Sequence, residues 1–162
     1  MTRNRLKRIA AATALLCALR LGTAPAQEAP PAGASPGGTI FATRCAVCHG
    51  PAAAGIPGTF PSLREQILSF AKSPAGRDYL VMVVSSGLMG ELSVAGVHYN
   101  NVMPAQSGLS EADVAAVLNY LAGDLGKQDL GGAALSADDV KDARARHPQN
   151  TAQSTRALRP AG

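Results

Sequence analysis

Cys45-Ala46-Val47-Cys48-His49 is the most constraining segment of this chain. Residues three apart share one face of a helix, so the two thiols can reach the two vinyl groups along one edge of a porphyrin and form thioethers. His49 then lies beneath the iron. C-x-x-C-H at this spacing is the signature of covalent haem attachment. The segment therefore predicts one covalently bound haem c.

A redox-active dithiol and half of a zinc site are the alternatives for the same thiols. A thioredoxin-like dithiol lies in a βαβ unit, and the sequence around the motif has no such pattern. A tetrahedral zinc site needs further ligands, and no second pair of cysteines is present. Both alternatives are less consistent with the sequence than haem.

The first 26 residues have the three parts of a secretory signal peptide. Basic residues come first, an apolar stretch follows at 9–19, and Ala24-Pro25-Ala26 forms a small-residue cleavage site. A membrane anchor is the alternative, but the apolar stretch is too short to span a bilayer and Arg20 interrupts it. We expect cleavage after Ala26, secretion across the inner membrane to the periplasm, and no membrane span afterwards.

Removal of this segment changes the charge of the protein. The full chain has 15 Lys and Arg against 11 Asp and Glu, a net charge of +4. Residues 1–26 contain five of the basic residues and none of the acidic ones, so the mature chain has ten against eleven, or −1. Because no basic helix or aromatic stacking surface is evident either, we predict no binding of nucleic acid.

The rest of the chain divides into three parts. Residues 27–36 are rich in Pro, Ala and Gly, a composition typical of a flexible leader. One domain is expected over 37–126, followed by a C-terminal extension over 127–162 with a short helix at 136–147. A domain of about 90 residues has a small core, and a buried haem would complete it.

Hydrophobic periodicity predicts three helices in the domain, at 39–47, 76–86 and 111–122. Ser110 and Asp113 form a capping box before the last of these helices, and Gly123 is expected to end it. Residues 91–99 alternate weakly and are consistent with a short hairpin.

In these features the sequence resembles the class I bacterial c-type cytochromes, especially cytochrome subunits or partners of periplasmic dehydrogenases. The resemblance implies an all-α, small cytochrome c fold in which N- and C-terminal helices cross around one covalent haem. Gly37 and Phe41 would meet Val117 and Tyr120 at that crossing. The matching elements are Gly37, Phe41, Cys45-x-x-Cys48-His49-Gly50, Phe60-Pro61-x-Leu63, Gly87-x-x-Gly90, Tyr99-Asn100-x-x-Met103-Pro104 and Val117-x-x-Tyr120.

The second axial ligand of the iron decides the class of function. A His and Met pair favours electron transfer at a raised potential, whereas an open position permits gas binding or peroxide chemistry. Pro104 restricts the backbone of Met103, which could therefore be presented from a stiff loop, and the resemblance implies that Met103 is the ligand. His98 is its main competitor. The remaining candidates are Met82, expected in the core, Met89, in a turn, and His147, expected to be solvent-exposed in the tail.

The resemblance also implies contacts around the iron ligands. The carbonyl of Pro61 would accept a hydrogen bond from the His49 ring, and Leu63 would pack on the haem. Further candidates for contacts to the propionates or the Met103 sulfur are Tyr99, Asn100 and Asn101, with Arg64 and Arg77 either propionate partners or solvated surface charges.

The signal peptide and the resemblance together predict a secreted monohaem one-electron carrier with no catalytic residues of its own. It would act between a periplasmic dehydrogenase, of which it could be a subunit, and the respiratory chain, through an oxidase or another cytochrome. The alternative is a haem enzyme or ligand sensor with a displaceable sixth ligand. The helix in the extension would dock on a partner or, as we expect from its thin apolar face, fray on the surface.

Overall fold

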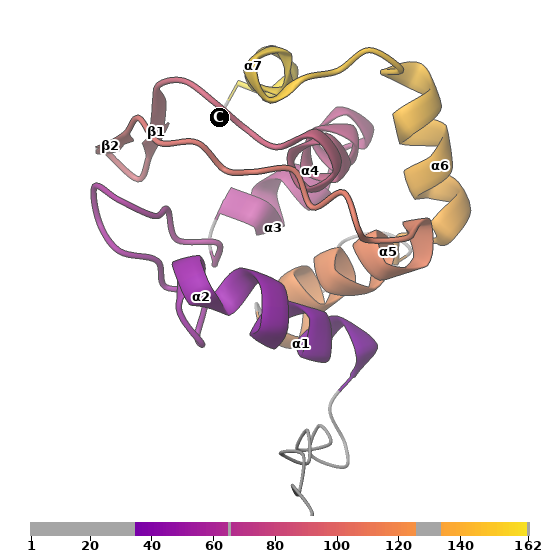
Figure 1. Cartoon of the computed structure of the whole chain (residues 1–162), viewed down its shortest axis with the longest axis horizontal. Coiled ribbons are helices and arrows are strands. Elements are labelled where there is room, and N and C mark those ends of the chain that lie inside the picture. The colour runs from indigo at the N-terminus through magenta and orange to yellow at the C-terminus, as the bar shows by residue number, and fades with distance from the viewer. Residues whose placement is uncertain (1–34, 65, 126–133, 162) are drawn as a thin grey trace, which may run out of the picture. The chain divides into compact units, whose positions relative to one another are not determined.

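The computed structural model describes residues 35–64, 66–125 and 134–161, which are mostly helical with one small hairpin (Figure 1). The predicted signal peptide and nearly all of the leader lie outside the described residues. Within the described part of the chain, no helix is long and apolar enough to cross a bilayer.

The first helix is continuous through three segments, which are α1 (Pro36–Ile40), the π-helical η1 (Phe41–Cys45) and α2 (Ala46–His49). It begins three residues before the predicted start at residue 39. Ser35 causes this difference, because its side chain accepts a hydrogen bond from the Gly38 N–H at 3.2 Å. Pro36, at the first helical position, is also pre-organised for helix.

The first helix crosses α5 (Glu111–Asn119) as predicted. Gly37 permits the contact, since a Cβ atom there would lie 2.1 Å from the Ala116 carbonyl oxygen. One turn further along, the rings of Phe41 and Tyr120 are 5.7 Å apart. Val117 is 1% exposed beside them. The crossing predicted from the sequence is therefore present, with the Ala116 backbone opposite Gly37.

The end of α5 differs from the prediction. The capping box of Ser110 and Asp113 begins α5 as expected. However, the helix continues through the π-helical segment η2 (Tyr120–Leu125), so Gly123 does not end it. A C-terminal glycine cap needs the left-handed backbone conformation, which Gly123 does not adopt.

Two helices and a hairpin lie between these crossing helices in the sequence. The helix α3 (Gln66–Ala71), which was not expected from the sequence, packs against α4 (Pro74–Ser86). The strands β1 (Leu92–Val94) and β2 (Val97–Tyr99) pair antiparallel, in agreement with the expected hairpin. Ala95 and Gly96 both have positive φ in its two-residue turn, as tight hairpins require.

The C-terminal extension is part of the packed structure, so the expectation of a frayed helix is wrong. It forms α6 (Ala137–Arg146), α7 (Ala152–Thr155) and the 3-10 turn η3 (Arg156–Leu158). The helix α6 packs against α4 and α5, and its Val140 and Ala143 are at most 1% exposed. The thin apolar face of α6 is docked against the body of the protein because both of these side chains are fully enclosed.

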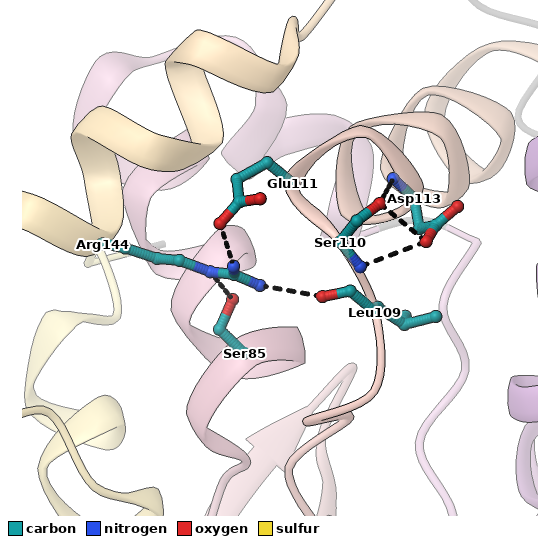
Figure 2. A network of polar contacts seen from close by, with 6 residues as sticks. All are labelled: Ser85, Leu109, Ser110, Glu111, Asp113 and Arg144. Atoms are coloured by element: carbon teal, nitrogen blue, oxygen red, sulfur yellow. Dashed lines mark hydrogen bonds and ion pairs between the residues drawn. The ribbon is translucent and has the colours of Figure 1, made fainter.

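Arg144 of α6 joins the end of α4 to the start of α5 (Figure 2). Its guanidinium donates to the Ser85 hydroxyl at 3.1 Å, to the Glu111 carboxylate at 2.6 Å and to the Leu109 carbonyl at 3.4 Å. His147 was expected to be solvent-exposed. It is instead partly buried, with its Nε2 atom 3.5 Å from the Asp78 carboxylate.

Candidate haem site

One apolar pocket contains most of the predicted site residues. Its volume is about 920 Å³ when the open solvent at its mouth is included. Its walls come from the end of α2, the loop 59–63, α4, the segment 88–94 and the loop 99–104. Helix α3 adds Phe70.

His49 lies at the end of α2, is 7% exposed, and is oriented by the backbone of the next loop. Its Nδ1 atom is 2.9 Å from the Pro61 carbonyl oxygen, so the expected bond is present. Because a carbonyl can only accept, Nδ1 donates and Nε2 keeps its lone pair for a metal. Burial lowers the pKa of His49, opposed in part by the bond to Pro61, and so favours the neutral ring, the form of histidine that can bind a metal.

The loop that carries Pro61 is held by its own backbone. The Gly55 N–H donates to the His49 carbonyl at 2.8 Å, and the Leu63 N–H donates to the Ala53 carbonyl at 2.9 Å. Gly55 has a φ of +70° and lies so close to Pro61 that a Cβ atom would be 2.6 Å from its carbonyl carbon. The acceptor for His49 is therefore fixed, and Leu63 is placed in the pocket wall.

The two thiols lie on the helix that ends in His49, and neither is in a disulfide. Cys48 lines the pocket. Cys45, at the end of the π-helical segment, is half-buried at the edge of the core. Burial raises the pKa of the Cys45 thiol, with the charge of Arg44 opposing the increase. The residues present fit a haem c, because two thiols can bond its vinyl groups and one imidazole and one thioether can bind its iron.

Met103 lines the same pocket from another loop. Its backbone forms two hydrogen bonds with Leu88, at 3.0 and 2.8 Å. Gly87, with a φ of +81°, allows this approach, since a Cβ atom there would lie 2.5 Å from the Met103 carbonyl oxygen. Beyond it, the Gln106 N–H donates to the Val84 carbonyl at 2.9 Å. The Met103 loop is thereby fixed to the end of α4.

The other proposed ligands lie elsewhere. Met82 is 3% exposed in the core and Met89 is 39% exposed, and His98 is on the exposed side of the hairpin. His147 lies beside Asp78. Among the His and Met side chains that the structure describes, only those of His49 and Met103 line this pocket.

The outer contacts are only partly as expected. Tyr99 is buried in the pocket wall. The Asn101 side chain donates to the Thr59 carbonyl at 2.9 Å, which links the Met103 loop to the loop that carries Pro61. Arg64 donates instead to the Ala52 carbonyl and Arg77 to the Ala71 carbonyl. Neither arginine lines the pocket, and Asn100 is exposed without lining it.

Sequence reasoning missed the wall that helices α3 and α4 provide. The apolar spacing of 76–86 predicted a helix but gave no indication that this helix lines a cavity, and α3 was not expected at all. The residues concerned are Phe70, Tyr79, Leu80 and Val83.

Comparison with known proteins agrees with this geometry. The family model described as Cytochrome c matches residues 34–123. The chain belongs to the cytochrome c family. It is 38% identical over 112 residues to a cytochrome c-552 of Thermus thermophilus, which covers 68% of this chain and 85% of the relative. A second cytochrome c-552 of the same species has the same identity, with 75% of its length covered.

The family match confirms the predicted class, the small helical fold and the cofactor. This cytochrome c carries covalently attached haem c, for which Cys45 and Cys48 are the matching thiols, and it is an electron carrier that acts with redox partners. The matched region ends at residue 123. Helices α6 and α7 therefore lie beyond it.

Proposed function

We propose that this cytochrome c is a monohaem carrier with His49 and Met103 as the two axial ligands of the iron. The observation that carries the proposal is that both side chains line one apolar pocket, His49 from the end of α2 and Met103 from a loop fixed by backbone hydrogen bonds. The competing histidines and methionines of the described chain lie outside it. Cys45 and Cys48 would form the thioethers.

The bound haem supplies one-electron chemistry between ferric and ferrous iron. The protein contributes orientation and environment. Pro61 holds the His49 ring in one tautomer, and the Leu88 backbone holds the Met103 loop. The apolar walls limit access of water, which with a thioether ligand favours the reduced state and a raised potential.

The proposed setting is the periplasm, after removal of residues 1–26. Electrons would arrive from a dehydrogenase and leave toward an oxidase or another cytochrome of the respiratory chain. Exposed apolar side chains support docking near the thioether edge, among them Val47 at 83%, Ile56 at 53% and Val102 at 59% exposed. Val102 also lines the pocket mouth. A small apolar surface suits a transient redox encounter.

Met103→Ala in the holoprotein tests the ligand assignment. Loss of the thioether opens a coordination position, so we expect rapid stoichiometric binding of carbon monoxide to the reduced protein and a lower reduction potential. Met89→Ala is the matched control, because the side chain of that methionine is exposed and does not line the pocket. It should change neither property.

Two results would contradict the proposal. An unchanged spectrum and potential in Met103→Ala would remove Met103 as the ligand. Rapid stoichiometric carbon monoxide binding by the unaltered protein would favour the haem enzyme or ligand sensor instead. Mass spectrometry of the exported protein tests the setting, with an N-terminus at Gln27 and one attached haem as the expected result.

A further inference from the structure

The C-terminal extension returns to the haem pocket after α6. It contacts the segment 88–94 at every second residue. The Met89 N–H donates to the Ala152 carbonyl at 2.8 Å. Arg156 donates to the Glu91 carbonyl at 3.2 Å, and Arg159 donates to the Ser93 carbonyl at 2.9 Å.

The alternate residues of the same segment belong to the pocket. Leu88, Gly90, Leu92 and Val94 all line it. The residues that line the pocket therefore alternate with residues whose backbone groups bond the tail, and one segment contacts both. The segment 88–94 therefore separates the C-terminal tail from the haem pocket.

The segment also connects the tail to Met103. The Leu88 backbone forms both hydrogen bonds to Met103, and the adjacent Met89 N–H is bonded to the tail. The Met103 loop can move away only if those two bonds break or if Leu88 moves with it. Movement of Leu88 in turn strains the bond between Met89 and Ala152.

The tail is itself held firmly enough to act as a support. Val140 and Thr155 are both 0% exposed, and α7 packs against α4. The guanidinium of Arg159 lies 5.6 Å from the centre of the Phe70 ring, within the range of a cation–π contact. Phe70 also lines the haem pocket. The tail is thus attached to the body of the protein before its contacts with 88–94, between them at Thr155, and at Arg159 itself.

We propose that Arg156 and Arg159 are positioning residues that hold the segment 88–94 against the Met103 loop and so slow the departure of the Met103 sulfur from the iron. The proposal rests on the proposed role of Met103 as axial ligand. Both arginines lie beyond residues 34–123, which the Cytochrome c family model matches.

The test is the double variant Arg156→Ala/Arg159→Ala in the full-length holoprotein. Imidazole, which competes for the sixth position of ferric haem, is mixed with the oxidised protein and its binding rate is followed optically. Loss of two exposed hydrogen bonds should raise the rate by roughly fivefold. Amide hydrogen exchange at Leu88 and Met103 should accelerate as well, while that of α5 stays unchanged.

Arg146→Ala is the matched control. It removes another arginine of the tail, one that contacts Asp78 and has no bond to 88–94, so its imidazole rate should equal that of the unaltered protein. Wild-type imidazole and exchange rates in the double variant would overturn the proposal. Equal acceleration of exchange across α5 would also overturn it, by indicating a loss of global stability. If the double variant does not fold, the two single substitutions are measured by the same criteria.

Met103→Ala separates this proposal from the one on which it rests. If Met103 is the ligand, that variant binds imidazole rapidly whether or not the two arginines are present. If Met103→Ala and the unaltered protein bind imidazole at the same rate, the ligand assignment fails. Amide exchange at Leu88 and residue 103 would then still show whether the tail holds the loop.

Discussion

Substitution of Gly37 by Ala should separate the first helix from α5. The added Cβ atom would lie 2.1 Å from the Ala116 carbonyl oxygen and 2.8 Å from the Tyr120 Cβ atom. Real Cβ atoms essentially never approach closer than 3.0 Å, so a movement of about 0.9 Å is needed at the contact. The nearest atom belongs to backbone and cannot rotate away.

The loss of stability in Gly37→Ala follows from the packing that this movement disturbs. Overpacking of a close contact lowers the free energy of unfolding by about 1–3 kcal/mol. Gly123→Ala is the matched control, since Gly123 is also in a helical segment but a Cβ atom there would meet nothing within 4 Å. There, removal of a flexible glycine should raise stability by about 0.5–1 kcal/mol. The two variants should therefore differ by roughly 1.5–4 kcal/mol.

Urea unfolding of the oxidised holoprotein measures this difference. Far-ultraviolet circular dichroism is the suitable signal because the chain is mostly helical and has no Trp. Linear extrapolation gives the free energy of unfolding for each variant. If Gly37→Ala is as stable as Gly123→Ala at an unchanged denaturant slope, the close approach at Ala116 does not determine how these helices pack.

Two further predictions concern the C-terminal extension. Val140→Ala should lower the free energy of unfolding by about 1–3 kcal/mol, because it leaves a cavity at a fully buried site; a change below about 0.5 kcal/mol in urea unfolding would mean that α6 is not docked. For Asp78, the hydrogen bond from Arg146 lowers the pKa of the carboxyl, burial opposes this, and the charge of Arg146 and the contact with His147 lower it further. This carboxylate therefore stabilises the fold above its unfolded pKa of about 3.9, and the contribution is lost as the pH falls through the lower folded pKa. Asp78→Asn should lack this dependence, so its stability deficit relative to the unaltered protein should shrink on acidification, and a deficit that stays constant in thermal unfolding would contradict the assignment.

The parts of the fold that could be predicted are those specified by local sequence or by a recognised motif. The capping box of Ser110 needs only a partner three residues away. The crossing at Gly37 and the bond from His49 to Pro61 were expected from the resemblance, and both are present. The hairpin has its turn residues between two short alternating runs.

The docking of α6 could not be predicted because its partners are distant in sequence. Arg144 is 33 residues from Glu111, and Arg146 is 68 residues from Asp78. Taken alone, the helix has a thin apolar face that is typical of a solvated surface helix. Its burial depends on a groove that α4 and α5 create only after folding.

The support of Met103 was hidden for the same reason. Pro104 suggested a stiff loop. However, the backbone of Met103 is bonded to Leu88, which lies before the hairpin in the sequence, whereas Met103 lies after it. Helix α3 was missed because six residues are too few for a 3.6-residue period to be distinguished.

The route of the extension also determines what a fusion to this protein would do. The described chain ends at residue 161, two residues after Arg159, which donates to the Ser93 carbonyl of β1, a strand that lines the pocket. A second redox domain joined here by a short flexible linker would be tethered beside the haem, at an effective concentration on the order of millimolar. Electron exchange between the two domains would then be intramolecular and independent of dilution.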